Sequence, residues 1–409
     1  MTLILKRQEW SETLVGKQTA LLAEIFTSFE DSFPKIQAWR RYLHEHPELS
    51  FQEVQTAAFI EEKLQQFGLT PERKGQLGIT ALVKGAAPGP TIALRADFDA
   101  LPIQEENQTA YRSQNPGVMH ACGHDGHTAA LLGVAEIFSQ HADQLQGNIL
   151  FVFQPAEELP PGGAKFMIEE GILADVDLVF AAHLASEIPL GQISVGAGPQ
   201  YAAVDKFEIT IKGKGGHGAR PQQTVDALVV GTTVVENLQK IVSRKIDPLK
   251  SAVVTVGVFQ AGNAFNVIPE TAQIAGTVRT FDPFVRQQVE EELRTIVSGI
   301  TNAFHADYEL DYLNGYPALF NPEKEAGIVR EIFAETFTPA QIISSEPTMG
   351  AEDFAYFLQE RPGTYFKVGS RTAEVATQFP HHHPRFDIDE QALLQTEKAF
   401  AAILAKYLF

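Results

Sequence analysis

The stretch VMHACGHDGHT, residues 118–128, contains the only cysteine of the chain. Cys122 and His124 are two positions apart, so on a turn or an extended segment both side chains can point to one ion. Thiolate and imidazole are good ligands for zinc and its neighbouring transition metals. A buried, inert thiol is the usual alternative for a lone cysteine. Whether Cys122 is a metal ligand or an inert thiol depends on the side chains that the fold places beside it.

Two adjacent carboxylates follow another apolar run. In GNILFVFQPAEE, Pro155 stops regular strand pairing, and Glu157 and Glu158 come soon after it. A hydrolytic metal site needs one carboxylate on the metal and a second, uncoordinated one that takes a proton from water. Neighbours on an irregular turn can divide these two tasks. Two glutamates on a solvated turn without function are the common alternative.

Further candidate ligands end other apolar runs. PTIALRADFDA leads into Asp97 and Asp99, and VDLVFAAHL ends at His183. A histidine at the end of an apolar strand can equally be a hydrogen-bonded core residue. The histidine triplet at 381–383 can be an exposed turn or can supply one more ligand.

The elements between these runs predict how the candidates are positioned. HTAALLGVAEIFSQHA and GGAKFMIEEGILA read as amphipathic helices, so strands alternate with helices as in a parallel α/β sheet. In such sheets, sites form beyond the carboxyl ends of the strands. We therefore expect five side chains to lie close together at one edge of the sheet: Asp97, Asp99, Glu157, Glu158 and His183.

The pattern changes near residue 200, where strands and helices follow in the order βαββαβ. This order is a ferredoxin-like unit complete in itself. We expect a second domain over 198–313, inserted into a first domain that comprises 1–197 and 314–409. Helical periodicity over 8–45 predicts a long helix, and residues 1–35 form an N-terminal helical extension.

Length, charge and cysteine content exclude several classes. At 409 residues the chain is long for one core, which favours two domains. Its 51 acidic and 32 basic residues give a net charge of −19, which repels phosphate backbones. The clearest basic clusters, Arg40-Arg41 and Arg244-Lys245, are short. The chain has a lone cysteine, and we find no leader-like apolar segment and no apolar run of membrane length. These features predict a cytoplasmic protein without nucleic-acid or membrane partners.

Seven motifs carry a resemblance to a known family: HACGHDGHT, QPAEE, AAHL, KGGHGARP, NVIPE, MGAEDFA and H-x-P-x-F at 382–386. In this order they cover about residues 36–400 and resemble the M20 metallopeptidase family, in its branch of aminoacylases, hippurate hydrolases and auxin-conjugate hydrolases. The resemblance implies an α/β catalytic domain of the zinc-peptidase type with a mixed, mostly parallel sheet. It also implies that the inserted domain is a lid and dimerisation domain.

The resemblance further implies two divalent metal ions per subunit, which could be zinc, manganese, cobalt or nickel. The family's catalytic base matches Glu157. Of the histidine triplet, only His382 fits the H-x-P-x-F motif. The positions that match the family's metal ligands, with the thiolate commonly bridging both ions, are Cys122, His124, Glu158, His183 and His382.

Three residues of the inserted domain match positions near the substrate. His217, in the glycine-rich GKGGHGARP, matches a family residue that reaches into the partner subunit's active site and stabilises the oxyanion, which implies a homodimer. Asn266 and Arg279 are candidates for binding the substrate's carboxylate or peptide oxygen, and the two-pronged guanidinium suits a carboxylate. Either residue could equally be structural.

Three acidic residues are expected to orient the metal ligands by hydrogen bonds. Asp97 and Asp99 stand where the wider family has a His-x-Asp ligand motif, but the histidine is absent here. We interpret both as hydrogen-bond acceptors that hold ligands rather than as ligands, and we expect Asp125 to orient His124.

These residues and the resemblance together imply metal-dependent hydrolysis of the amide bond of N-acyl-L-amino acids to a carboxylic acid and a free amino acid. Two stretches depart from the family pattern: LPPGGAKFM after the glutamates and QQTVD after HGARP. Because both flank the expected acyl pocket, the preferred substrate stays open. A dipeptidase or carboxypeptidase of the same fold, or a non-catalytic metal-binding dimeric scaffold, are the alternatives.

Overall fold

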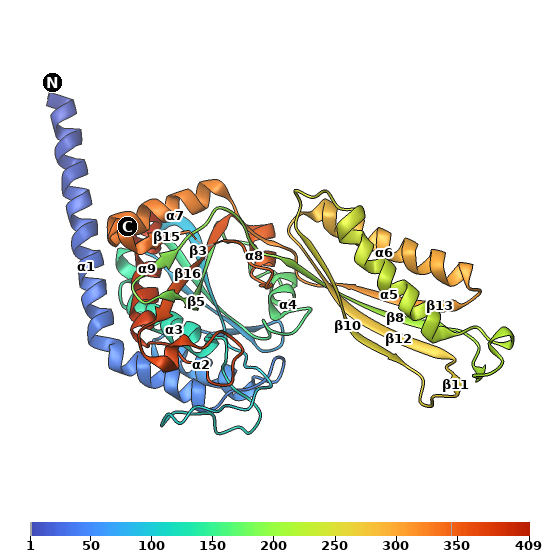
Figure 1. Ribbon diagram of the computed structural model, residues 1–409. Coiled ribbons are helices and arrows are strands. Elements are labelled where there is room, and N and C mark those ends of the chain that lie inside the picture. The colour runs from blue at the N-terminus through green and yellow to red at the C-terminus, as the bar shows by residue number, and fades with distance from the viewer. Residues whose placement is uncertain (1, 345) are drawn as a thin grey trace. The chain divides into compact units, whose positions relative to one another are not determined.

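The computed structural model describes residues 2–344 and 346–409. Contacts divide the chain into two compact units (Figure 1). The second unit comprises Pro199–Phe320 and Pro347–Ala355, and the first contains the remainder. The second unit therefore extends past the expected end of the insert at 313. The chain stays paired beyond that point, because the backbone N–H of Val204 donates to the carbonyl of Tyr316 at 3.1 Å.

Eight strands of the described residues form the mixed sheet of the first unit, in the order β1-β2-β4-β3-β5-β16-β6-β15. Its centre is parallel, since β4 and β5 flank β3 in parallel and β16 continues parallel to β5. The predicted mixed, mostly parallel α/β sheet is thus confirmed. The strands are β1 (Glu72–Lys74), β2 (Gly78–Lys84), β3 (Ala87–Asp97), β4 (Gln146–Gln154), β5 (Leu178–Pro189), β6 (Ile193–Ser194), β15 (Ile342–Ile343) and β16 (Gly363–Arg371).

Helices complete the first unit, and three of them, α1, α3 and α9, pack against one another. Buried aromatic residues such as Phe138, Phe180 and Phe366 belong to the core of this unit. The helices are α1 (Thr2–Glu45), α2 (Val54–Gln66), α3 (His124–Gln140), α4 (Gly163–Glu169), α7 (Glu323–Thr336), α8 (Ala355–Glu360) and α9 (Gln391–Leu408). Helix α4 is shorter than the sequence pattern suggests, because Gly171 adopts a left-handed φ of 81° just after it.

The second unit has its own core and its own sheet, in the order β10-β12-β8-β13 with antiparallel neighbours. This order confirms the ferredoxin-like βαββαβ unit, and Figure 1 shows both of its helices on one face of the sheet. Asp226 and Asp282 cap these helices through hydrogen bonds to backbone N–H groups. The elements are β8 (Ala203–Lys212), α5 (Ala227–Arg244), β10 (Ala252–Ala261), β12 (Thr271–Thr280), α6 (Pro283–Ala303) and β13 (Asp307–Asn314).

Small elements complete the chain. Strands β9 (Gly216–His217) and β11 (Val267–Ile268) pair with each other, and β7 (Gly198–Tyr201) and β14 (Leu319–Asn321) lie where the chain passes from one unit to the other. Short 3₁₀ turns are Ala142–Gln144, Pro221–Gln223, Pro339–Gln341 and Val375–Gln378. Within the described ranges, no helix is both long and apolar enough to cross a membrane.

Candidate metal centre

The register of the central strands brings the predicted residues to one edge of the sheet. On β3, Asp97 lies opposite Gln154, the last residue of β4, and Arg95 lies opposite Ala181 of β5. His183 follows two positions after Ala181, within β5. The expectation that this strand ends at His183 is wrong, because β16 pairs with β5 as far as Pro189.

The turn into α3 places Cys122 and His124 on either side of Gly123. This glycine has a φ of 96°, a left-handed conformation that glycine adopts without a steric penalty. Cys122 is 9% exposed and His124 is 1% exposed. Burial, followed by the charges of Glu158 and Glu157, raises the pKa of the Cys122 thiol well above its usual range. A thiolate at this position therefore requires a cation beside it.

Hydrogen bonds fix the ring of His124 with one nitrogen free. Its Nδ1 lies 3.0 Å from the backbone oxygen and 3.1 Å from Oδ1 of Asp99, so Nδ1 is the donor. The buried Nε2 has no hydrogen-bond partner among the described residues, and it lies 3.9 Å from Oε1 of Glu158. Burial lowers the pKa of His124, but the charges of Asp97 and Asp99 outweigh this and raise it to about 10. An unpartnered nitrogen beside carboxylates suits a bound cation.

His183 presents its Nε2 in the same way. Its Nδ1 lies 2.8 Å from the carbonyl oxygen of Leu184, which can only accept, so the lone pair is on Nε2. This Nε2 lies 3.5 Å from Sγ of Cys122. Burial, followed by the charges of His127 and His381, holds the pKa of His183 well below its usual range. The ring is therefore neutral, as a metal ligand must be.

Glu157 and Glu158 lie on the turn after β4. Ala156 precedes them with a left-handed φ of 53°, and its N–H donates to Oε1 of Glu53 at 2.8 Å. Glu157 is 7% exposed. The backbone N–H of Glu158 donates to Oδ2 of Asp99 at 3.0 Å, so Asp99 holds both this turn and His124.

Two members of the histidine triplet reach the same region. His382 has a left-handed φ of 64° and donates its N–H to the carbonyl of Ala121 at 2.8 Å. Its Nε2 lies 3.1 Å from Oε1 of Glu158, although its side chain is 51% exposed. His381 lies on the other side, where its Nε2 accepts from Ser186 N at 3.3 Å and its Nδ1 is buried without a partner among the described residues. The sequence prediction chose His382 from the triplet, and the structure also places His381 beside Cys122 and His183.

Among the described residues of the first unit, four groups have donor atoms that all lie within 4.8 Å of one another, and one of these is Asp97 with His124 and His127. The other three are Cys122 with Glu158 and His382, Cys122 with His183 and His381, and His124 with Glu157 and Glu158. We call these seven residues the candidate metal centre. Cys122 and Glu158 each belong to two sets, so one thiolate and one carboxylate can serve neighbouring cations. Soft thiolate, imidazole and carboxylate donors in this arrangement fit two divalent transition-metal ions.

Asp97 and His127 form a hydrogen-bonded pair behind this centre. His127 Nδ1 lies 2.6 Å from Asp97, and its Nε2 accepts from the N–H of Leu184 at 2.9 Å. With both ring nitrogens occupied, His127 supports the strand that carries His183 and is not free to bind a cation. Asp97 also accepts from Arg95 at 2.6 Å.

The predicted role of Asp125 needs correction. Its carboxylate accepts hydrogen bonds from Arg40 Nε and His44 Nδ1, both at 2.8 Å, and not from His124. The Nδ1 of His124 is already occupied by Asp99. Asp125 thus joins α3 to α1. Arg40 and His44 are four positions apart in α1, but the sequence pattern does not reveal that this polar pair is buried.

The residues predicted to stabilise the oxyanion or to bind the substrate lie in the second unit. His217 in β9 is exposed, and it pairs with Val267 of β11. The N–H of Gly218 donates to the carbonyl of Asn266 at 2.8 Å, so the His217 and Asn266 loops are adjacent. Arg279 lies near the far end of β12, half-buried, where its Nη1 donates to the carbonyl of Val278 at 3.2 Å. The roles of these three residues stay predictions.

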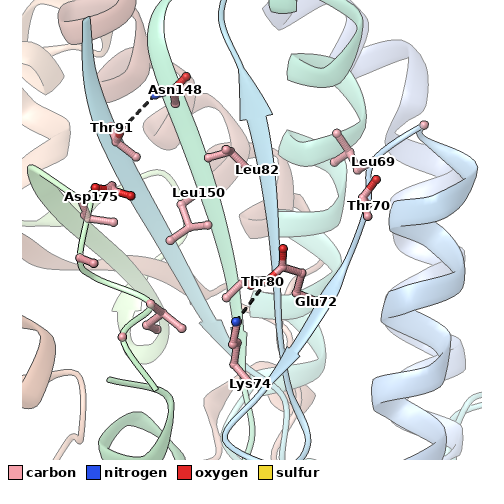
Figure 2. Close-up of a pocket in the computed structure, with 15 residues that line it drawn as sticks. Leu69, Thr70, Glu72, Lys74, Thr80, Leu82, Thr91, Asn148, Leu150 and Asp175 are labelled. Carbon is pink, nitrogen blue, oxygen red and sulfur yellow. Dashed lines mark hydrogen bonds and ion pairs between the residues drawn. The ribbon is translucent and has the colours of Figure 1, made fainter. Parts of the chain in front are cut away.

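A cavity of about 630 Å³ lies along the same sheet, away from the candidate metal centre. Figure 2 shows Thr91, Asn148 and Leu82 on its wall, with Asn148 donating to Thr91 at 3.0 Å. Thr91 lies in the first half of β3, whereas Asp97 ends that strand. None of the residues of the centre lines this cavity, so it is a separate feature.

Comparison with known proteins identifies the family. The chain matches the model of peptidase family M20/M25/M40 over residues 93–406. It is 46% identical to YhaA of Bacillus subtilis over 95% of this chain and 98% of that protein, and 54% identical to an N-acyl-L-amino acid amidohydrolase of Geobacillus stearothermophilus over 69% and 77%. The crystal structure of Bacillus subtilis YXEP, described as a dinuclear metal binding peptidase of this family, matches with a TM-score of 0.79 at 36% identity, covering 92% of this chain and 98% of that one. The chain therefore belongs to the M20 peptidase family, in its amidohydrolase branch.

Proposed function

We propose that this hydrolase cleaves the amide bond of N-acyl-L-amino acids, such as N-acetyl or N-benzoyl conjugates, to a carboxylic acid and a free amino acid. The observation that carries the proposal is the adjacent pair Glu157 and Glu158 beside the unpartnered Nε2 of His124. The names of two relatives support the substrate class. One is the amidohydrolase of Geobacillus stearothermophilus, and the other is an N-acetyl-L-cysteine deacetylase of Bacillus subtilis, 42% identical over 87% of this chain.

The proposed ligands of two divalent cations are Cys122, His124, Glu158, His183 and His382. Zinc, manganese, cobalt or nickel, when bound there, would polarise the substrate carbonyl and lower the pKa of water. Asp99 and the Leu184 carbonyl hold the Nδ1 atoms of His124 and His183, so each ring turns Nε2 toward the centre. Cys122 gives up its proton when it becomes a ligand.

Proton transfer falls to Glu157. It takes a proton from the attacking water and delivers it to the amide nitrogen as the C–N bond breaks, so that the amine leaves neutral. His217 of the partner subunit would donate a hydrogen bond to the oxyanion. Asn266 and Arg279 would bind the substrate's carboxylate or peptide oxygen. A homodimer is therefore part of the proposal.

The test combines metal analysis with a substrate panel. We expect about two metal equivalents per chain, and hydrolysis of N-acetyl-methionine and N-benzoylglycine that is lost on chelation and restored by added metal. Glu157→Gln should keep the metal and lose about 10²- to 10⁴-fold in kcat. The matched control is Glu170→Gln, an exposed glutamate that follows α4. Unchanged turnover by Glu157→Gln would contradict the assignment.

A carboxypeptidase activity is the second candidate. Thermostable carboxypeptidase 1 of Saccharolobus solfataricus is 36% identical over 94% of this chain and 99% of that protein. The two candidates differ in what lies on the acyl side of the scissile bond. Preferential hydrolysis of dipeptides over N-acetyl and N-benzoyl amino acids would favour the carboxypeptidase, and metal binding without hydrolysis of any of them would indicate a scaffold.

A further inference from the structure

Arg40 of α1 has a fully buried guanidinium. Its Nε donates to Oδ2 of Asp125 at 2.8 Å, its Nη2 to Oδ1 of Asp387 at 2.9 Å, and its Nη1 lies 3.3 Å from Oε1 of Glu390. A buried cation is tolerated only when such partners compensate for its lost hydration. Three carboxylates from two segments of the chain provide that compensation here.

The partners of Arg40 lie next to proposed metal ligands. Asp125 directly follows His124 in the first turn of α3. Asp387 lies on the same irregular segment as His382, and Tyr111 holds its other oxygen with a 2.8 Å hydrogen bond. His382 and His124 both approach Oε1 of Glu158, at 3.1 and 3.9 Å. One guanidinium thus joins the two segments that bring histidines to the same oxygen of Glu158.

We propose that Arg40 is a positioning residue of the metal centre, and that its planar fork sets the spacing between the segments that carry His124 and His382. Among the described residues, Arg40 has no hydrogen bond or ion pair with a proposed ligand, so it acts through Asp125 and Asp387. The inference rests on the ligand set of the proposed function and not on its substrate.

Arginine is chemically specific for this task. Its guanidinium presents donors in fixed directions in one plane, so two carboxylates on different nitrogens are held at a defined separation. A lysine ammonium is a point charge on a flexible stem and can satisfy the same charges without fixing that separation. The neighbouring Arg41 also bonds Glu390, but its side chain is 43% exposed, and its ion pair is with Glu390 rather than with Asp125 or Asp387.

A purely structural role for Arg40 is the alternative, because the same contacts tie α1 to the rest of the first unit. The test therefore measures cobalt(II) binding to the metal-free full-length chain. Visible absorption reports the coordination geometry, and near-ultraviolet thiolate-to-cobalt absorption reports Cys122. For Arg40→Met, we expect about 10- to 100-fold weaker cobalt(II) binding and altered visible bands in a protein whose circular dichroism shows that it is folded.

Two arginine variants separate positioning from stability. Arg40→Lys should restore part of the affinity without restoring the wild-type bands. Arg361→Met is the matched control, because the half-buried Arg361 ties distant segments through the carbonyls of Val176 and Leu173, both at 2.7 Å. We expect it to lower the thermal midpoint and to bind cobalt(II) like the wild type. Wild-type affinity and bands in folded Arg40→Met would overturn the inference.

If Arg40→Met does not fold, Asp387→Asn tests the same inference. This variant removes one carboxylate partner of Arg40 and leaves the other two, Asp125 and Glu390, in place. We expect one of two cobalt(II) equivalents to bind about tenfold more weakly, and wild-type binding of both would overturn the inference. A wild type that binds two equivalents but hydrolyses no N-acyl amino acid refutes the proposed substrate alone. A wild type that binds no cobalt(II) overturns both proposals.

Discussion

Helices α1, α3 and α9 bury titratable groups in two places, and the two places differ. Next to the candidate metal centre, Arg40 of α1 meets Asp125 of α3, and His44 bonds the same aspartate. Further along the same helices, Glu397 of α9 is fully buried against Gly133 of α3. Neither carboxylate oxygen of Glu397 has a hydrogen-bond partner among the described residues.

The difference shows two ways in which a fold accommodates a buried titratable group. Burial raises the pKa of Asp125, but the charges of Arg40 and His44 outweigh this and hold it well below its usual range, so Asp125 is a fixed anion. Burial, followed by the charge of Glu136, raises the pKa of Glu397 well above its usual range, so Glu397 is a neutral acid. The buried carboxyl group is thus charged where buried cations pair with it and neutral where the described part of the chain gives it no such partner.

Asp125→Asn tests the paired region with the largest expected effect. The variant leaves the buried Arg40 with one anion fewer, and breaking a buried pair typically costs about 3–5 kcal/mol in the free energy of unfolding. Urea denaturation of the metal-free protein measures this cost. Asp175→Asn, at an exposed aspartate, is the control. A loss as small as that of the control would mean that the pairing contributes no more than a surface contact.

His44 makes the paired region sensitive to pH. Burial and the charge of Arg40 lower its pKa, but Asp125 and Glu105 outweigh them and raise it to about 9. The folded value exceeds the unfolded value of about 6.5, so the stabilisation is fully present below about pH 6.5 and is lost as the pH rises through about 9. Over this window the wild type should lose about 3 kcal/mol relative to His44→Gln. Urea denaturation at several pH values measures the free energy of unfolding of both proteins. If the two free energies changed equally with pH, this prediction would be refuted.

Glu397→Gln tests the unpaired region. Because the folded pKa lies above the unfolded value of about 4.3, native protein binds more protons, and its stability falls as the pH rises above about 4.3. Glutamine keeps the shape and cannot ionise. We expect the variant to be about 1–2 kcal/mol more stable than the wild type near pH 8 and similar near pH 4, as thermal midpoints would show. Lower stability of the variant near pH 8 would instead mean that the carboxyl has a stabilising partner.

Arg41→Met should have the smallest effect. Arg41 donates to both oxygens of Glu390 at 3.0 and 2.7 Å, but its side chain is 43% exposed. Exposed pairs contribute roughly 0.2–1 kcal/mol, so the free energy of unfolding should fall by about 0.5 kcal/mol. A change as large as that in Asp125→Asn would remove the distinction between Arg41 and its buried neighbour.

Local patterns predicted much of this architecture. Alternation of strands and helices placed Asp97, Asp99 and the glutamate pair at one sheet edge, and the βαββαβ order identified the second sheet. In the sequence, Arg40 and Arg41 form one short basic cluster. The structure separates the two residues, because successive side chains of a helix point about 100° apart and only Arg40 faces inward.

The remaining features depend on contacts between residues that are far apart in the sequence, and these could not be predicted. The Arg40 partner Asp387 is 347 positions away, and no local periodicity signals such a pair. His381 lies beside Cys122 and His183, and His382 has a left-handed φ; the triplet HHH reveals neither. Asp125 is expected from the sequence to orient His124, whereas its hydrogen bonds reach α1.

The Arg40–Asp387 bond also sets an order for biosynthesis. A ribosome adds about 5–20 residues per second, so between Asp125 and Asp387 it works for about 13–50 s. During that time the nascent chain holds Arg40 and Asp125, and it makes the whole second unit before the last carboxylates emerge. The guanidinium cannot close its bridge until then. If Arg40 positions the metal centre as proposed, that centre is completed only on a nearly finished polypeptide.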